Sequence, residues 1–215
     1  MSCARSFCAR RCGHTPTVSN RAPTNGTRFT RAQIAVEIAR LAEEISHDHQ
    51  DGVVLVGVLK GALPFLADLM RALTVVPEVD FLSISPYRAG SGRVRLMMDL
   101  RTDINSRAVV LVDDVVDTGL TLAFLLAELA TRGPASLDVC TLFDKVSRRL
   151  APVPLRYRGF PVADQYLIGF GLDHEGRYRD THDVVAVDRE RLVKDPDSAL
   201  SLLYPDARAQ IGPEG

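Results

Sequence analysis

Apolar residues along this chain follow two spacings, one typical of amphipathic helices and the other typical of buried strands. Between Thr30 and His47 they recur three and four positions apart, which predicts a helix, and Thr30 and Gln33 match a capping box at its start. Continuous apolar runs rich in β-branched residues predict strands that are buried on both faces. Strands are predicted at 53–59, 79–85, 94–98, 108–112, 137–143, 166–168 and 184–187, and further helices at 62–73, 120–131 and 198–203.

The alternation of apolar strands with helices of about a dozen residues predicts an α/β fold, a mostly parallel sheet with helices on both faces. A chain of 215 residues with 46% hydrophobic and 25% charged residues fits one domain of an ordinary globular protein. We place this domain at residues 29–190. It follows an Arg-rich extension, 1–28, that we expect to be disordered, and precedes a charged C-terminal tail, 191–215.

Charge and cysteine content narrow the class of protein. A net charge of −1 argues against a nucleic-acid partner, and the apolar runs are far shorter than the roughly 20 residues that span a bilayer. The four cysteines suggest no disulfide framework, so we expect a reducing, cytoplasmic location. Cys3, Cys8 and Cys12 with His14 could bind a metal, but their spacing matches no strong zinc pattern. The acid-free start of the chain also leaves a transit peptide open.

Carboxylates and hydroxyls gather directly after the predicted strand 108–112. The residues concerned are Asp113, Asp114, Asp117, Thr118, Gly119 and Thr121. Ligands in open α/β sheets bind beyond the carboxyl ends of the strands. Free N–H groups and hydroxyls at a helix start suit a phosphate, and a glycine lets the backbone approach it closely. Carboxylates would repel that phosphate unless they bind sugar hydroxyls, a base N–H or a metal ion. The pattern therefore favours a phosphorylated sugar over a simple helix cap.

Lysine is rare in this chain, because only three of its 26 basic residues are lysines. Lys60 follows the predicted strand 53–59, and Lys145 follows the predicted strand 137–143. A compact ammonium at such positions, in a chain that otherwise uses arginine, indicates a specific need for lysine.

Residues 110–121 resemble the phosphoribosyl-pyrophosphate signature of the type I phosphoribosyltransferases. Over about residues 30–188, several motifs in the same order resemble the hypoxanthine-guanine phosphoribosyltransferases. The resemblance implies the type I fold, with a small hood subdomain and a flexible lid loop beside the sheet. It also implies an Mg²⁺-dependent enzyme of purine salvage, which forms IMP or GMP and pyrophosphate from hypoxanthine or guanine and phosphoribosyl pyrophosphate.

Within this resemblance, Asp117 is expected to take or stabilise the proton at N7 of the base. Asp113 and Asp114 are expected to bind the ribose hydroxyls, directly or through Mg²⁺. The residues expected to hold the 5′-phosphate are Thr118, Gly119 and Thr121.

The pyrophosphate site is implied by two other motifs. The segment that ends with Lys60 and Gly61 resembles the family's pyrophosphate loop, in which the Leu–Lys peptide bond is often cis and turns N–H groups toward pyrophosphate. Arg179 matches an arginine that pairs with pyrophosphate. Asp173 is expected to hold a Mg²⁺ ion that also binds pyrophosphate.

The base site is implied by residues around two later strands. Lys145 is expected to donate to the 6-oxygen of the purine, because a 6-amino group would face it with a second donor. Tyr166 is expected to stack on the purine, and Leu167 to offer backbone groups to its edge. Tyr87 belongs to the expected lid, but Pro86 interrupts the Ser-Tyr pair that the family usually carries there.

Several alternatives stay open at this point. A xanthine-preferring or broad 6-oxopurine transferase would share these motifs, and so would a regulatory protein that senses nucleotides and binds RNA. A P-loop NTPase is excluded because the chain has no Gly-x4-Gly-Lys-Ser/Thr run. The resemblance implies a homodimer or homotetramer. The preferred base, the oligomer size, the purpose of residues 1–28 and the effect of Pro86 are not determined by the sequence.

Overall fold

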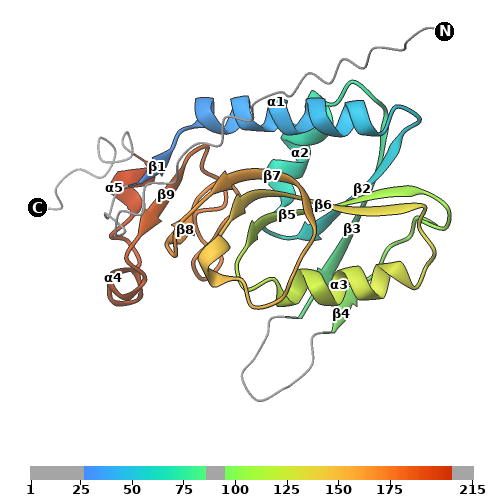
Figure 1. The fold of residues 1–215 in the computed structure, drawn as a ribbon. Helices are drawn as coiled ribbons and strands as arrows, with labels where there is room; N and C mark the ends of the chain where they lie inside the picture. The colour runs from blue at the N-terminus through green and yellow to red at the C-terminus, as the bar shows by residue number, and fades with distance from the viewer. Residues whose placement is uncertain (1–26, 86–94, 205–215) are drawn as a thin grey trace, which may run out of the picture.

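The structure of this chain is a computed structural model, which describes residues 27–85 and 95–204. Two β-sheets organise these residues, and helices cover the larger sheet (Figure 1). The strands are β1 (Arg28–Phe29), β2 (Val53–Leu59), β3 (Pro77–Ile84), β4 (Leu96–Met98), β5 (Ala108–Val116), β6 (Ser136–Asp144), β7 (Leu155–Pro161), β8 (Tyr166–Ile168) and β9 (Val184–Val187). The helices are α1 (Arg31–Asp48), α2 (Leu63–Ala72), α3 (Leu120–Ala130), α4 (Arg189–Lys194) and α5 (Leu200–Leu203), with a short 3-10 helix at Val146–Arg148.

The larger sheet has six strands in the order β4-β3-β2-β5-β6-β7. All neighbouring strands run parallel except β4, which is antiparallel to β3. Helices α1 and α2 lie on one face, and α3 lies on the other (Figure 1). This arrangement confirms the predicted mostly parallel sheet flanked by helices. It also places the carboxyl ends of the parallel strands at one edge, where ligands bind in such folds.

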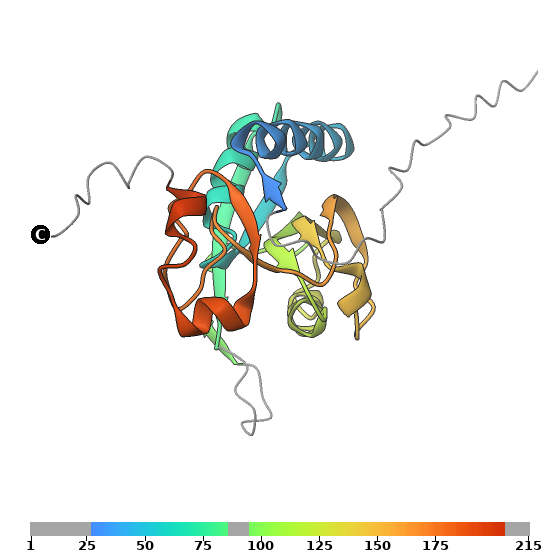
Figure 2. The same cartoon turned by 90° about the vertical axis from the view of Figure 1, so that its left-hand side faces the viewer.

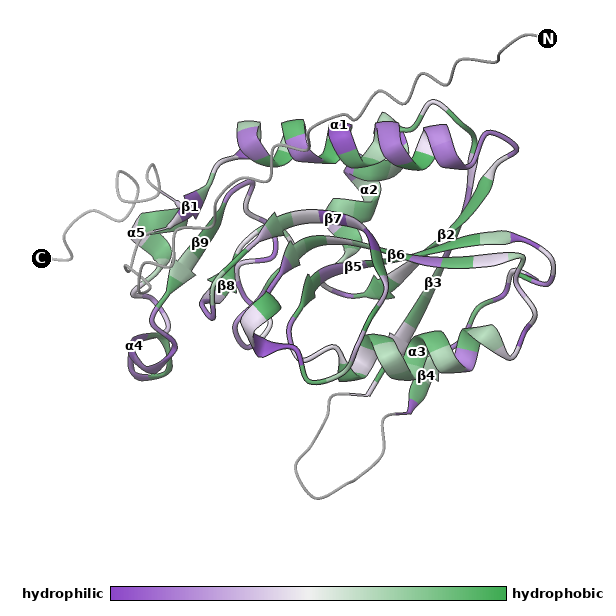
Figure 3. Ribbon diagram, in the orientation of Figure 1, coloured by the Kyte–Doolittle hydropathy of each residue, from purple (hydrophilic) through white to green (hydrophobic). Residues whose placement is uncertain are grey.

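Strand β2 illustrates why the central strands are apolar at every position. Leu55 packs in the core cluster with residues of α1 and α2, whereas its neighbours Val54 and Val56 pack in the cluster with residues of α3. Because successive side chains point to opposite faces, a strand covered on both faces must be apolar throughout. Figure 3 shows apolar residues along the central strands and alternating polar bands along the outer helix α1.

The first helix begins where its capping box predicts. The Gln33 N–H donates to Oγ1 of Thr30 at 3.3 Å, and the Thr30 N–H donates to Oε1 of Gln33 at 2.9 Å. These two bonds satisfy donors that the first turn of a helix cannot satisfy by itself. The bounds predicted for β2, β8 and β9 are likewise confirmed residue by residue.

Strand β5 is longer than the sequence predicts. It was expected to end at Val112, but it continues through Asp113 and Asp114 to Val116. The reason is that the neighbouring strand β6 extends as far, so that Asp113 pairs with Thr141 and Val116 pairs with Asp144. Ladder pairing with an adjacent strand outweighs the local preference of two aspartates for a loop.

Strand β7 was not predicted. Its sequence contains Arg156, Arg158 and Pro161, which weaken the apolar pattern of a strand. The strand lies at the end of the sheet and pairs only with β6 among the described strands. An edge strand tolerates proline and charge, because one of its sides needs no ladder partner.

The second sheet has the order β1-β9-β8, is antiparallel, and forms a small hood beside the central sheet (Figures 1 and 2). Residues 191–204, assigned to the tail from sequence, pack on this hood. Leu192 and Leu203 are buried in one cluster with Ile168 and Val185.

Several predictions concern residues outside the described ranges. The cysteines of residues 1–26, Pro86 and Tyr87 of the expected lid, and residues 205–215 all belong to this group. Within the described ranges, no helix is long and apolar enough to cross a membrane.

Candidate active site

Two adjoining cavities lie beyond the carboxyl ends of the central strands. The larger has a volume of about 820 Å³, and its lining includes Asp117, Lys145, Tyr166, Leu167 and Asp173. The smaller has a volume of about 240 Å³, and its lining includes Gly61, Asp113, Asp114, Thr118, Gly119 and Thr121. Asp114 and Asp117 border both cavities. The fold therefore gathers at one edge of the sheet most of the residues that sequence motifs single out.

Gly61 sits where three distant segments of the chain meet. The Leu59–Lys60 peptide bond just before it is cis. A Cβ atom on Gly61 would lie 1.8 Å from Oδ2 of Asp114, and a Cβ atom on Gly171 would lie 2.0 Å from the Gly61 carbonyl oxygen. The end of β2, the end of β5 and the segment after β8 thus approach too closely for any side chain at either glycine. The Lys60 side chain is exposed and does not line either of these two cavities.

Asp113 and Asp114 form a pair of carboxylates inside the sheet edge. Their bonds run to backbone groups: Oδ1 of Asp113 accepts from the Asp114 N–H at 3.1 Å, and Oδ1 of Asp114 accepts from the Val115 N–H at 2.8 Å. Neither forms a salt bridge with any cation of residues 27–85 or 95–204. Burial, reinforced by the neighbouring Asp114 charge, raises the pKa of Asp113 well above its ordinary value, and burial also raises the pKa of Asp114. A ligand that supplies hydroxyl donors or a cation would relieve this electrostatic cost.

The turn between β5 and α3 leaves a helix start open toward the smaller cavity. Gly119 is the N-cap of α3 with φ of +80°, and a Cβ atom there would lie 2.8 Å from the Ala151 carbonyl oxygen. No side chain caps the helix, although Oγ1 of Thr118 lies 3.4 Å from the Leu120 N–H. The free N–H groups and the positive end of the helix dipole suit an anion such as a phosphate.

The Asp117 carboxylate interacts with two cations at the larger cavity. Nζ of Lys145 lies 3.4 Å from Oδ2, and Nε of Arg148 donates to Oδ1 at 3.0 Å. Burial opposes ionisation of Asp117, but the Arg148 hydrogen bond and the Lys145 charge outweigh it, so the pKa of Asp117 is lowered. The carboxylate is therefore ionised at neutral pH. Lys145 is only 8% exposed, which leaves its ammonium few partners besides Asp117 and a bound ligand.

One wall of the larger cavity comes from β8 and the segment that follows it. Tyr166 borders the cavity, and the Arg189 guanidinium carbon lies 5.6 Å from the centre of its ring. Leu167 is buried beside it. Farther along, Oδ1 of Asp173 pairs with the Arg179 guanidinium at 2.6 Å.

Two residues that line the larger cavity, Arg148 and Arg189, are not singled out by the sequence motifs. Both lie among other polar residues outside a recognisable motif, so no local signal separates them from ordinary surface charges. The position of Arg148, three residues after Lys145 at the end of β6, was the one available clue.

The described residues contain no group of three or more His, Cys, Asp or Glu side chains that could hold a metal ion. The acidic residues that line the two cavities are Asp113, Asp114, Asp117, Asp164, Asp173 and Asp188, and Asp117 and Asp173 are both paired with cations. A metal at this site would therefore need oxygen ligands from water or substrate besides the protein.

Known proteins resemble this chain in sequence and in structure. The phosphoribosyl transferase domain family matches residues 28–175. A hypoxanthine-guanine phosphoribosyltransferase of Mycobacterium avium is 43% identical over 162 residues, which cover 71% of this chain and 80% of that protein. A hypoxanthine phosphoribosyltransferase of Escherichia coli is 40% identical over 154 residues, which cover 69% and 86%. A mutant hypoxanthine phosphoribosyltransferase of Trypanosoma cruzi, solved with the product IMP, superposes with a TM-score of 0.74 at 33% identity, covering 83% of this chain and 98% of that one.

Proposed function

This chain belongs to the phosphoribosyl transferase family, and we propose that it joins hypoxanthine or guanine to the ribose phosphate of phosphoribosyl pyrophosphate. The fold is the type I phosphoribosyltransferase fold. One observation carries the proposal: an ion pair of the buried Lys145 and the partly exposed Asp117 faces one cavity, and an open helix start with two carboxylates faces the cavity beside it. The relatives named hypoxanthine phosphoribosyltransferases, one of them bound to IMP, support the same substrates.

The reaction is a displacement at the anomeric carbon of the ribose. N9 of the base forms a bond to this carbon, and the bond from the carbon to the pyrophosphate oxygen breaks. Pyrophosphate leaves with the bonding electrons, and the proton at N7 of the base passes to the Asp117 carboxylate. Oδ1 and Oδ2 of Asp117 are suited to this role because the lowered pKa keeps them ionised.

Lys145 links recognition of the base to the proton transfer. Its ammonium donates to the 6-oxygen of the purine, whereas a 6-amino group would offer it no acceptor. When Lys145 turns to the base, Asp117 loses one of its two cationic partners and becomes a stronger base. Arg148 remains at 3.0 Å and holds the carboxylate in place. Tyr166 stacks on the purine and Leu167 binds its edge through backbone groups.

The phosphoribosyl group occupies the smaller cavity. Its 5′-phosphate lies at the start of α3, against Thr118, Gly119 and Thr121. Its hydroxyls bind Asp113 and Asp114, whose carboxylates accept hydrogen bonds from backbone N–H groups and form no salt bridge within the described residues.

The leaving pyrophosphate lies near Gly61 and the Asp173–Arg179 pair. Lys60 and Arg179 supply positive charge, and Gly61, which has no side chain, lets the Asp114 carboxylate lie directly against its backbone. Mg²⁺ fits this site: it typically binds through one or two carboxylates, retained waters and phosphate oxygens, and Asp173, Asp113 and Asp114 are available. When bound, it neutralises charge that develops on the departing pyrophosphate.

The proposal extends to features that lie partly outside the described residues. Tyr87 serves as part of a lid that excludes water from the reaction. Residues 29–190 form the core of the catalytic domain, and residues 191–204, which pack on its hood, belong to the same domain. The protein works in the cytoplasm as a homodimer or homotetramer. Sedimentation of the purified chain would test the oligomeric state.

The experiment that tests this function is Mg²⁺-dependent consumption of phosphoribosyl pyrophosphate with hypoxanthine, guanine, xanthine, adenine and uracil in parallel. We expect turnover of hypoxanthine or guanine and none of adenine or uracil. Turnover of adenine, or of no base at all, would contradict the proposal.

The role of Asp117 is tested separately with Asp117→Asn. We expect kcat to fall by about 10²- to 10⁴-fold, the usual contribution of a general base, while phosphoribosyl pyrophosphate still binds. The matched control is Asp138→Asn, which removes an ion-paired carboxylate near the opposite end of β6 and should leave turnover near the wild-type rate. Equal rates for the two variants would remove Asp117 from this role.

A further inference from the structure

Tyr166 carries a polar contact that stacking on a purine does not require. Its hydroxyl donates to the Asp173 carbonyl oxygen at 3.2 Å and lies 3.1 Å from Nδ1 of His174. The Tyr166 and His174 rings meet edge to face, with centroids 5.8 Å apart and planes at 88°. One side chain thus borders the base cavity with its ring and reaches the Asp173 backbone with its hydroxyl.

We propose that the Tyr166 hydroxyl is a positioning group, which ties the base-stacking strand β8 to the segment that places Asp173 and Arg179 at the pyrophosphate. The inference rests on the function proposed above. It concerns how the base site and the pyrophosphate site are held relative to each other.

The segment from Gly169 to Arg179 has little regular structure to hold it. Two short bridges, Gly169 with Leu172 and His174 with Arg177, are its only ladder pairs. Several of its residues have positive φ: Gly169, Phe170, Gly171, Glu175, Gly176 and Tyr178. Because no helix or extended strand fixes this segment, the place of Asp173 depends on individual contacts. The Tyr166 hydroxyl makes one of them, directly to the Asp173 carbonyl.

We call the hydrogen bond from the Tyr166 hydroxyl to the Asp173 carbonyl the tether. Its tyrosine end lies in regular secondary structure. Tyr166 lies in β8 and pairs with Val187 of β9 in the hood sheet. His174 is only 6% exposed, and its Nε2 has no hydrogen-bond partner among the described residues. Loss of the tyrosine hydroxyl would therefore leave the buried His174 ring without a hydrogen bond to any described residue. Such a loss favours rearrangement of the segment around it.

The tether predicts a specific division of effects. Tyr166→Phe keeps the ring that faces the base and removes one oxygen atom. Asp173 and Arg179 pair with each other at 2.6 Å, so a shift of the backbone at Asp173 displaces both groups. Affinity for magnesium and pyrophosphate groups should therefore fall, while affinity for the base should not.

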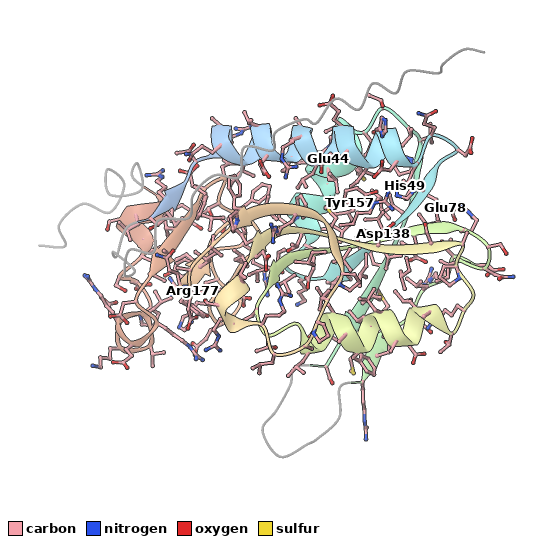
Figure 4. All side chains as sticks on the ribbon, in the orientation of Figure 1. Glu44, His49, Glu78, Asp138, Tyr157 and Arg177 are labelled. Atoms are coloured by element: carbon pink, nitrogen blue, oxygen red, sulfur yellow. The ribbon has the colours of Figure 1, made fainter. Side chains whose placement is uncertain are left out.

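The test compares full-length wild type, Tyr166→Phe and the control Tyr157→Phe. Tyr157 is a buried tyrosine whose hydroxyl donates to Oδ2 of Asp48 at 3.0 Å, and it packs against α1 (Figure 4). Steady-state kinetics would give KM for hypoxanthine, KM for phosphoribosyl pyrophosphate and the Mg²⁺ concentration for half-maximal rate. For Tyr166→Phe we expect KM for phosphoribosyl pyrophosphate and the half-maximal Mg²⁺ concentration to rise about 5- to 10-fold, the effect of one lost hydrogen bond. KM for hypoxanthine should change less than about twofold.

Two His174 variants separate the tether from a general loss of packing. His174→Asn keeps a polar atom near the position of Nδ1 and should behave like wild type. His174→Leu removes it but leaves the hydrogen bond from Tyr166 to the Asp173 carbonyl, so it should raise KM for phosphoribosyl pyrophosphate less than Tyr166→Phe does. Parallel changes in both KM values for Tyr166→Phe, or no change in either, would overturn the proposal.

Binding measurements keep the two proposals distinguishable. If the wild type turned over no base, the proposed function would fail. Calorimetric titration of wild type and Tyr166→Phe with magnesium pyrophosphate would then test the tether alone. Weaker binding by Tyr166→Phe than by wild type supports it, and equal or undetectable binding by both overturns it.

Discussion

The close approach of Gly171 to Gly61 makes a sharp prediction for Gly171→Ala. An alanine Cβ there would lie 2.0 Å from the Gly61 carbonyl oxygen and 3.0 Å from Cδ of Pro64. The first contact is with backbone, so it cannot be relieved by rotating a side chain. The substitution must move the Lys60–Gly61 loop, the segment after β8, or both.

Gly176→Ala supplies a matched control. Gly171 and Gly176 have similar positive φ values, +95° and +86°, but a Cβ on Gly176 would meet nothing within 4 Å. Both variants therefore bear the cost of a left-handed backbone with a side chain, about 1–2 kcal/mol. Only Gly171→Ala adds overpacking, which costs about 1–3 kcal/mol in a well-packed region.

The additional destabilisation of Gly171→Ala relative to Gly176→Ala can be measured as a difference in Tm and in activity. For a chain of this size, about 2 kcal/mol corresponds to a Tm difference on the order of 6 °C between the two variants. A displacement of about 1 Å at the pyrophosphate loop should also lower kcat/KM for phosphoribosyl pyrophosphate by about 10²-fold in Gly171→Ala. Gly176→Ala should stay within about threefold of wild type. Equal losses of Tm and of activity in the two variants would refute the steric argument.

Three further predictions concern charged and buried groups. Lys145→Gln should narrow the preference for hypoxanthine over adenine by at least about 10-fold in kcat/KM, because an amide offers both a donor and an acceptor to the base; an unchanged ratio would exclude Lys145 as the selector. Arg148→Gln should raise the pKa of Asp117, whose ionised form is required, so the acid limb of kcat/KM should move to higher pH; an unmoved limb would contradict it. Burial lowers the pKa of His49, so the unfolded chain binds more protons below pH about 6.5 and stability should fall there by at most about 1.4 kcal/mol per pH unit. Urea unfolding between about pH 5 and 8 should show a shallower fall for His49→Gln, and identical slopes would show that His49 does not titrate in this way.

The sequence by itself determined the features that depend on neighbouring residues. The capping box at Thr30 and Gln33 predicts the start of α1, since both partners lie within one helical turn. The apolar run of β2 predicts a strand covered on both faces, and the structure places it in the middle of the sheet. The sequence also placed Asp117 and Lys145 directly after apolar strands. Because the carboxyl ends of parallel strands share one edge, these residues were expected to lie close together.

The tertiary structure decided what depends on residues far apart in the chain. Strand β5 continues to Val116 because β6 offers ladder partners that the local sequence does not contain. The pKa of Asp117 is lowered because Lys145 and Arg148, about 30 positions later in the chain, lie against it. Nothing in the segment around Gly171 indicates that its space is taken by the Gly61 carbonyl. Local pattern specifies the elements and their chemistry, whereas electrostatics and close contacts arise only when the fold brings distant elements together.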